Sequence, residues 1–236
     1  MNRQGNVYTI IYSVVLVGVV GIVLSLVYQA LRPAQEENIS NDKKRQILAA
    51  ARILPAEGQS IADLYKEHIV DSYIVNSKGE KIDGNKSAFD IETGNEVKLA
   101  ADKRALPVFV CMTDQGDKYI LPVYGAGLWG PIWGYIAFDD NGNTIYGAYF
   151  AHEGETPGLG AEIEKPAFSS QFDGKNIFNN EGVFESIAVL KQGQSANGKA
   201  SVNAVSGGTI TSQGVQKMLY NSLEPYSAFL KNLDKQ

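Results

Sequence analysis

The chain has few of the side chains on which most catalytic and metal sites depend. Its 236 residues include one cysteine, Cys111, and two histidines, His68 and His152. A single cysteine cannot form a disulfide within the chain, so cysteine usage leaves the redox compartment undecided. His152 is followed by Glu153 and Glu155, but this spacing is not the H-E-x-x-H pattern of zinc sites. We therefore predict no metal ligands.

A catalytic base for a serine or threonine hydrolase is also lacking. Such an enzyme pairs its nucleophile with a histidine, and no G-x-S-x-G elbow surrounds the candidate hydroxyls of Ser206 and Thr211. A basic excess is absent too, since the formal net charge is −5 and the pI is about 5.1. Nucleic-acid-binding proteins usually carry a basic patch, so we expect no nucleic-acid partner.

Charged residues are missing from Gln4 to Leu31, where valine, isoleucine and leucine dominate. A bilayer-spanning helix needs about 20 apolar residues, which predicts a single membrane anchor over residues 1–32. The apolar core is longer than that of a signal peptide, and no A-x-A cleavage site follows it. A lipoprotein is excluded because the cysteine, Cys111, is far away. We therefore expect an uncleaved anchor.

The side of the membrane is not fixed by charge. Arg32, Lys43, Lys44 and Arg45 follow the apolar run, so the positive-inside count alone would keep the large domain in the cytoplasm. Long domains, however, often cross the membrane regardless of flanking charge.

The remaining sequence predicts a linker and one soluble domain. Residues 33–59 are interpreted as a polar linker over Pro33–Asp42 and a helix that ends near Ile53. Residues 60–236 begin with a second amphipathic helix and continue with apolar segments separated by hairpin turns. We predict an α+β fold with a mainly antiparallel sheet and flanking helices. The expected strands cover 72–75, 106–111, 118–123, 135–138, 144–150 and 184–190.

A glycine-rich segment with several hydroxyl groups, Ser206–Ser212, lies near the C-terminus and precedes an amphipathic helix predicted over 213–230. Adjacent glycines permit close approach of a bulky group, and hydroxyl residues are typical helix N-caps. A helix N-terminus is a natural phosphate site. The alternative, an ordinary capped loop, stays open on this segment alone.

Two further segments place glycine beside an aromatic or a turn. In Gly125–Trp129, an indole beside glycines could stack on a flat ring, or Trp129 could be an ordinary core aromatic. In Glu155–Gly160, Pro157 and Gly158 form a turn, and we expect the N–H groups from Gly158 to Gly160 to be free for a ligand.

Together these segments resemble the FMN-binding domain family, found in the C subunit of the sodium-translocating NADH:quinone reductase and in the G subunit of the related Rnf complex. The family pattern Ser/Thr-Gly-Ala-Thr-x-Ser/Thr matches 206–211, with Gly208 in place of alanine. The family segments Gly-x-Gly-Leu-Trp, Asp-x-x-Gly-Asn-Thr and Glu-Thr-Pro-Gly-Leu-Gly match 125–129, 139–144 and 155–160.

The resemblance implies that FMN is attached covalently, by a phosphoester, to Thr211. It implies no catalytic residue in this chain, because the bound FMN itself carries the electrons. The expected flavin site comprises Thr211 together with Ser206, Gly207, Gly208, Thr209, Ser212, Trp129, Glu155, Thr156, Gly158, Leu159 and Gly160.

The resemblance further implies membership of a multi-subunit, sodium-pumping NADH:quinone reductase. Such a chain sits in the bacterial inner membrane with its soluble domain in the periplasm, and a separate flavin transferase attaches the FMN. No G-x-G-x-x-G follows a strand and opens a helix, so we expect the isolated chain to lack the complete activity. Two alternatives remain: the G subunit of an Rnf complex, and a membrane-anchored scaffold without flavin.

Overall fold

A long first helix, α1 (Asn6–Ala50), begins with the apolar run predicted as an anchor. The computed structural model describes residues 5–82 and 86–233, and α1 is the helix there that is long and apolar enough to cross a membrane, by length and composition. Its apolar side chains between Val7 and Leu31 are exposed. This helix could therefore anchor the protein in a bilayer.

The linker expected over Pro33–Asp42 is wrong, because these residues continue α1 with Pro33 inside the helix. A proline inside a helix removes one backbone hydrogen bond and crowds the preceding turn, but alanine, glutamine and glutamate, which favour helix, follow Pro33. An ion pair of 2.8 Å between Arg32 and Glu36 joins adjacent turns. The helix stops at Ala50, before the predicted Ile53, since Arg52 takes the left-handed conformation with φ 62°.

The chain divides into two compact units, Met1–Lys43 and Lys44–Gln236. The division predicted from sequence, 1–32, 33–59 and 60–236, stays a prediction, and its outermost residues 1–4 and 234–236 lie outside the described part of the chain. Residues Ile47, Leu48 and Ala50 of α1 are fully buried in the second unit.

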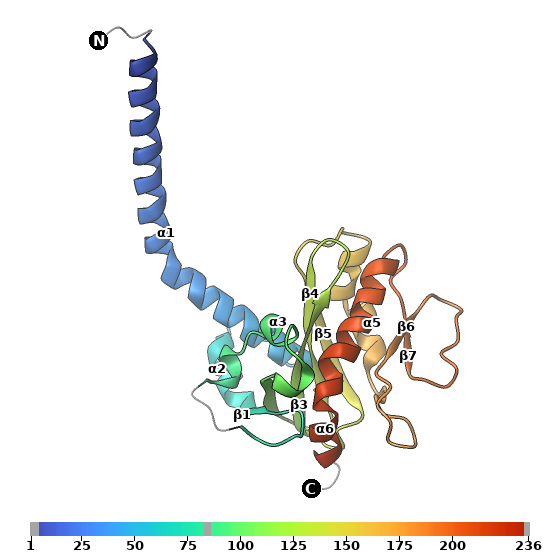
Figure 1. Cartoon of the computed structure of the whole chain (residues 1–236). Helices are drawn as coiled ribbons and strands as arrows, with labels where there is room; N and C mark the ends of the chain where they lie inside the picture. The colour runs from blue at the N-terminus through green and yellow to red at the C-terminus, as the bar shows by residue number, and fades with distance from the viewer. Residues whose placement is uncertain (1–4, 83–85, 234–236) are drawn as a thin grey trace. The chain divides into compact units, whose positions relative to one another are not determined.

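Five antiparallel strands form the main sheet in the order in which they occur in the chain (Figure 1). This confirms the predicted fold class and most of the predicted strands, because alternating apolar residues and tight turns specify consecutive hairpins. The strands are β1 (Ile69–Val75), β2 (Leu106–Thr113), β3 (Gly116–Ala126), β4 (Pro131–Phe138) and β5 (Ile145–His152).

Each face of the sheet carries its own apolar cluster, because successive side chains of a strand point to opposite faces. Val108 packs in the cluster that also holds Val215 and Met218 of α5 (Thr209–Leu223), the helix lying along β3 in Figure 1. Phe109 and Cys111 pack in the other cluster, with Ile47 and Ala50 of α1 among its members. Burial raises the pKa of the Cys111 thiol to about 12, which suits a packing role.

The C-terminal helix predicted over 213–230 is instead two helices, α5 and α6 (Ser227–Leu233), joined by a 3-10 turn over Glu224–Tyr226. Pro225 lies in that turn, where its missing N–H and fixed φ interrupt the α-helical bonding. The strand predicted over 184–190 shortens to β6 (Ala188–Leu190), which pairs in parallel with β7 (Ser201–Asn203). Within the described residues, the other α-helices are α2 (Ile61–His68), α3 (Thr93–Glu96) and α4 (Pro166–Ser169).

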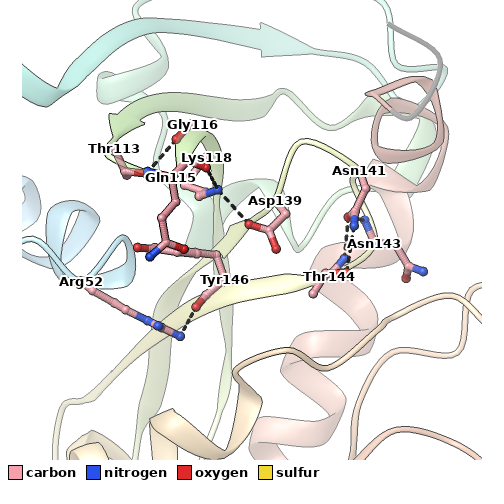
Figure 2. A network of polar contacts seen from close by, with 10 residues as sticks. All are labelled: Arg52, Thr113, Gln115, Gly116, Lys118, Asp139, Asn141, Asn143, Thr144 and Tyr146. Atoms are coloured by element: carbon pink, nitrogen blue, oxygen red, sulfur yellow. Dashed lines mark hydrogen bonds and ion pairs between the residues drawn. The ribbon is translucent and has the colours of Figure 1, made fainter.

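A network of polar contacts stabilises the turn between β4 and β5 (Figure 2). Lys118 is 3% exposed, and its Nζ lies 2.9 Å from Oδ1 of Asp139 and 2.7 Å from the carbonyl of Gln115. The carbonyl oxygen of the Asn141 side chain accepts the N–H groups of Asn143 and Thr144, at 2.9 Å each. The matched segment 139–144 therefore stabilises the hairpin.

Candidate functional site

Three segments that are distant in sequence meet at the start of α5. They are the loop between β3 and β4, the loop after β5, and the glycine turn that precedes α5. Hydrogen bonds and close glycine packing connect Trp129, Glu155, Gly160 and Thr211 across these segments. The structure thus brings together one or more residues from each of the three motifs singled out in the sequence.

The turn before α5 uses glycine in two ways. Gly207 has φ 73°, a left-handed conformation that glycine adopts without strain, and Gly208 is the N-cap. No side chain caps the helix, so the expected hydroxyl N-cap is wrong, and the helix starts at Thr209 rather than Gln213. The N–H of Ser212 donates to the Gly208 carbonyl at 2.9 Å and forms the first helical bond. The N–H groups of the first turn therefore point out of the helix end, where an anion can bind.

A buried hydroxyl–carboxylate contact lies at the centre of the site. The Thr211 hydroxyl donates to Oε2 of Glu155 at 2.6 Å, and the other carboxylate oxygen accepts the N–H of Trp129 at 2.9 Å. Thr211 is 1% exposed and Glu155 is 4% exposed. Sequence reasoning named both residues as flavin ligands but did not foresee that they contact each other.

Two glycines leave the space that this carboxylate occupies. A methyl group on Gly127 would collide with Oε1 of Glu155. One on Gly160 would collide with Oε2 and with the Thr211 hydroxyl oxygen. Any side chain at either position would therefore displace the carboxylate or the threonine.

The groups around Glu155 favour the charged form of its carboxyl despite its burial. Burial raises the pKa of its carboxyl, but the Thr211 hydroxyl, the N–H groups of Trp129 and Leu128, and the nearby His152 together lower the pKa below its ordinary value. His152 accepts the backbone N–H of Glu155 at Nδ1, at 3.2 Å. The carboxylate contacts a residue in the first turn of α5, where the helix dipole also favours negative charge.

Exposed apolar side chains come from the same three segments. The exposed fractions are 47% for Leu128, 69% for Trp129, 43% for Leu159 and 54% for Ile210. Trp129 is therefore not a core aromatic, and the alternative that it packs in the interior is wrong. The Leu159 side chain lies against the α-carbon of Gly207, where a methyl group would collide with it. Apolar side chains beside a helix N-terminus suit a ligand with a flat ring and a phosphate.

The loop of Glu155–Gly160 is closed by its own hydrogen bonds. The N–H of Gly158 donates to Oε1 of Glu162 at 3.2 Å, and the N–H of Leu159 donates to the Thr156 carbonyl at 3.1 Å. The expectation that the N–H groups of Gly158 and Leu159 are free is therefore wrong, because the turn and the following 3-10 helix use them. Gly158 has φ 75° and Thr156 is exposed.

The remaining hydroxyls of the C-terminal motif differ in their surroundings. Ser206 is exposed in the turn, and Thr209 is half-buried. Ser212 is 1% exposed, and its hydroxyl oxygen accepts the N–H of Val205 at 3.0 Å. Across residues 5–82 and 86–233, no group of three or more histidine, cysteine, aspartate or glutamate side chains could hold a metal ion.

The site lies within a region that matches a known family model. Residues 127–224 match the FMN-binding domain. Among curated proteins, the C subunit of the Na(+)-translocating NADH-quinone reductase of Vibrio vulnificus is 34% identical, with 84% of this chain and 83% of that protein covered. The protein of the same name from Pseudomonas aeruginosa is 30% identical, with 99% and 98% covered.

Two solved structures share the fold. The crystal structure of the C subunit from Parabacteroides distasonis has a TM-score of 0.77 and 50% identity, covering 85% of this chain and 96% of that one. The crystal structure of NqrC from Shewanella oneidensis has a TM-score of 0.69 and 27% identity, with coverage of 84% and 98%.

Proposed function

Because the chain belongs to the C-subunit family of the Na(+)-translocating NADH-quinone reductases, we propose that it relays electrons through FMN attached by a phosphoester to Thr211. Membership of this family, together with the FMN-binding domain match, makes it a flavoprotein subunit of an oxidoreductase complex. In the proposed role, that complex passes electrons from NADH to quinone and moves sodium ions, and the isolated chain does neither.

The observation that carries this proposal is the contact between Thr211 and Glu155 at the start of α5. Three hydroxyl residues, Thr209, Thr211 and Ser212, lie in the first turn of the helix. Of these, Thr211 is the one whose hydroxyl donates to a carboxylate, at 2.6 Å. The Ser212 hydroxyl instead supports the preceding turn through Val205. A hydroxyl beside a carboxylate is the better nucleophile for forming a phosphoester.

The described residues fit FMN. Backbone N–H groups at Thr209 and Ile210 would hold the phosphate, because a helix start presents free donors and a positive dipole end. The exposed side chains of Leu128, Trp129 and Leu159 would contact the flat ring. When bound, FMN supplies one-electron transfer, and the protein supplies orientation and electrostatics. The proposed site also includes Ser206, Gly207, Gly208, Ser212, Glu155, Thr156, Gly158 and Gly160.

Because Thr211 is buried, the residues that cover its hydroxyl must move before FMN can be attached to it. Gly160 packs directly against the Thr211 hydroxyl, and the neighbouring Leu159 lies on Gly207 while remaining 43% exposed. We propose that these two residues move aside during modification. Gly158, whose positive φ places it at a turn with open space around its α-carbon, provides a suitable pivot.

The membrane topology and the maturation partner complete the proposal. Helix α1 anchors the chain in the inner membrane, and the FMN domain lies in the periplasm, where a flavin transferase modifies it. The family relationship favours the sodium-pumping reductase over the G subunit of an Rnf complex, because the relatives named above are C subunits of the reductase. The second alternative, a membrane-anchored scaffold, predicts a chain without flavin in the following test.

The direct test uses the full chain produced with its host's flavin transferase. After denaturing electrophoresis we expect a fluorescent band, and peptide mass spectrometry should find one FMN on the peptide that contains Thr211. Thr211→Ala should abolish the band, whereas Thr209→Ala and Ser212→Ala, which remove neighbouring hydroxyls, should keep it. A dark wild-type band would contradict the covalent flavoprotein and favour the scaffold. Flavin retained in Thr211→Ala would contradict the attachment residue.

A further inference from the structure

We propose, resting on the covalent attachment above, that Glu155 of this chain is the base that takes the Thr211 hydroxyl proton when the phosphoester forms. The protein thus supplies part of the catalytic apparatus for its own modification, and the flavin transferase supplies the rest. Glu155 contacts the reacting oxygen directly, at 2.6 Å, within the range that a general base requires.

The carboxylate is held in place for this role. The N–H of Trp129 binds Oε1, so Oε2 is left to accept the Thr211 proton. Gly127 packs against Oε1, where a methyl group would collide with it, so this packing and the Trp129 N–H still hold the carboxylate when Gly160 moves aside. A base whose rotamer is fixed by backbone donors and close packing loses little freedom in the reaction.

The other titratable groups nearby have different contacts. His152 accepts the backbone N–H of Glu155 through Nδ1, and its Nε2 lies 3.7 Å from Glu164. Glu162 accepts the N–H of Gly158. Glu153 is exposed, on the side of Gly130. The described part of the chain therefore presents Glu155 as the base in contact with Thr211.

The step needs a flavin whose phosphate is activated as a phosphoanhydride, as in a flavin dinucleotide. A bond forms between Oγ1 of Thr211 and the flavin-side phosphorus, and the anhydride P–O bond breaks to release a nucleoside monophosphate. The hydroxyl proton passes to Oε2 of Glu155, and nothing is oxidised or reduced. An alcohol is a weak nucleophile at neutral pH, so removal of this proton is the task that a base must perform.

Attachment of FMN to Thr211 also changes the electrostatic surroundings of Glu155. The modified Thr211 has no hydroxyl proton to donate, and a negatively charged phosphodiester now lies close to the carboxyl. Loss of a donor and gain of a like charge both raise the pKa of Glu155. We expect the carboxyl to give up its negative charge more readily in the loaded protein, which limits repulsion at the start of α5.

The test compares three variants of the full chain in detergent, with an excess of flavin transferase and a flavin dinucleotide. Covalent flavin is followed with time by in-gel fluorescence. Glu155→Gln keeps the size and the oxygen that accepts the Trp129 N–H but cannot take a proton, so its rate should fall about 100-fold or more. Glu155→Asp keeps a carboxylate and should be faster than Glu155→Gln. Glu153→Gln, an exposed neighbour, should match the wild type.

The outcomes separate the two proposals. A wild-type chain that takes up no flavin refutes the proposed function itself. A wild-type chain that is loaded normally, with Glu155→Gln equal to it or faster than Glu155→Asp, refutes the base and leaves the function standing. If circular dichroism shows that Glu155→Gln is unfolded, the wild-type pH profile decides. A rate nearly independent of pH above about pH 6 supports an already ionised base, whereas a tenfold rise per pH unit refutes it.

Discussion

Replacing Gly160 with alanine tests the geometry of the site without any flavin. The added methyl group would collide with Oε2 of Glu155 and with the Thr211 hydroxyl oxygen. Both of these atoms are buried, and neither belongs to the far end of a flexible surface side chain. The protein must therefore either accept the overpacking or move the carboxylate away from the threonine.

Both responses carry a similar cost. Overpacking of a buried site costs about 1–3 kcal/mol, and loss of a hydrogen bond to a charged group costs about 1.5–3 kcal/mol. We expect Gly160→Ala to lower the free energy of unfolding by about 2–3 kcal/mol. For a domain of about 150–250 residues, each kcal/mol lowers Tm by about 2–4 °C, so a fall of about 4–12 °C should follow.

Gly154→Ala provides the matched control. Gly154 lies in the same loop and is exposed, and a methyl group there would meet no atom within 4 Å. Its effect should be between neutral and a stabilisation of about 1 kcal/mol, through the unfolded state. Both variants are measured by thermal and urea unfolding of the protein before flavin attachment. Equal stabilities for Gly160→Ala and Gly154→Ala would refute the tight packing around Glu155.

Three other predictions concern stability and topology. The pKa of Glu155 is lower in the folded protein than in the unfolded chain, so its charge stabilises the fold fully above the unfolded pKa of about 4.3. This stabilisation is lost as the pH falls through the folded pKa. Urea unfolding at several pH values should show this loss in the wild type but not in Glu155→Gln. Tyr226→Phe removes a buried hydroxyl that donates to the Pro107 carbonyl at 2.9 Å and should cost about 1–3 kcal/mol, whereas exposed Tyr220→Phe should cost little, as measured by urea unfolding. Cys111 is fully buried, so in a Gln192→Cys variant the exposed new thiol is the one expected to react with a maleimide. A membrane-impermeant maleimide should label this variant in intact spheroplasts. Labelling only after lysis would contradict a periplasmic domain.

The sheet could be predicted from sequence because its strands are consecutive. From β2 to β5, a short turn joins each strand to the next, so alternation and turn residues such as Asp114–Asp117 specify these strands and their order. The pairing of β1 with β2 spans the longer connection 76–105, which no turn pattern predicts. The helix boundaries were less predictable. The polar composition of Pro33–Asp42 predicts a linker, yet α1 continues through this segment, because the alanine, glutamine and glutamate after Pro33 favour helix.

The sequence predicts candidate members of the site, which stay a prediction, but it does not predict how Thr211 and Glu155 are arranged. The motif resemblance identified Thr211 and Glu155, which are separated by 56 positions in sequence. Their contact depends on how the loop after β5 packs on α5, and no local pattern encodes that packing. Gly127 could not be assigned a role either, since its close approach to Glu155 appears only when the hairpin and the loop meet.

The burial of the last turns of α1 has a consequence for how the protein can be divided. The apolar composition ends at Leu31, but Ile47, Leu48 and Ala50 fill the interior beneath the sheet. A protease that cuts between residues 32 and 43 would release a domain whose interior is complete. A cut after Ala50 would remove three fully buried side chains and leave a cavity beneath the sheet. The end of the apolar segment, at Leu31, is therefore not the start of the folded domain, which needs the buried residues of α1 from Ile47 onward.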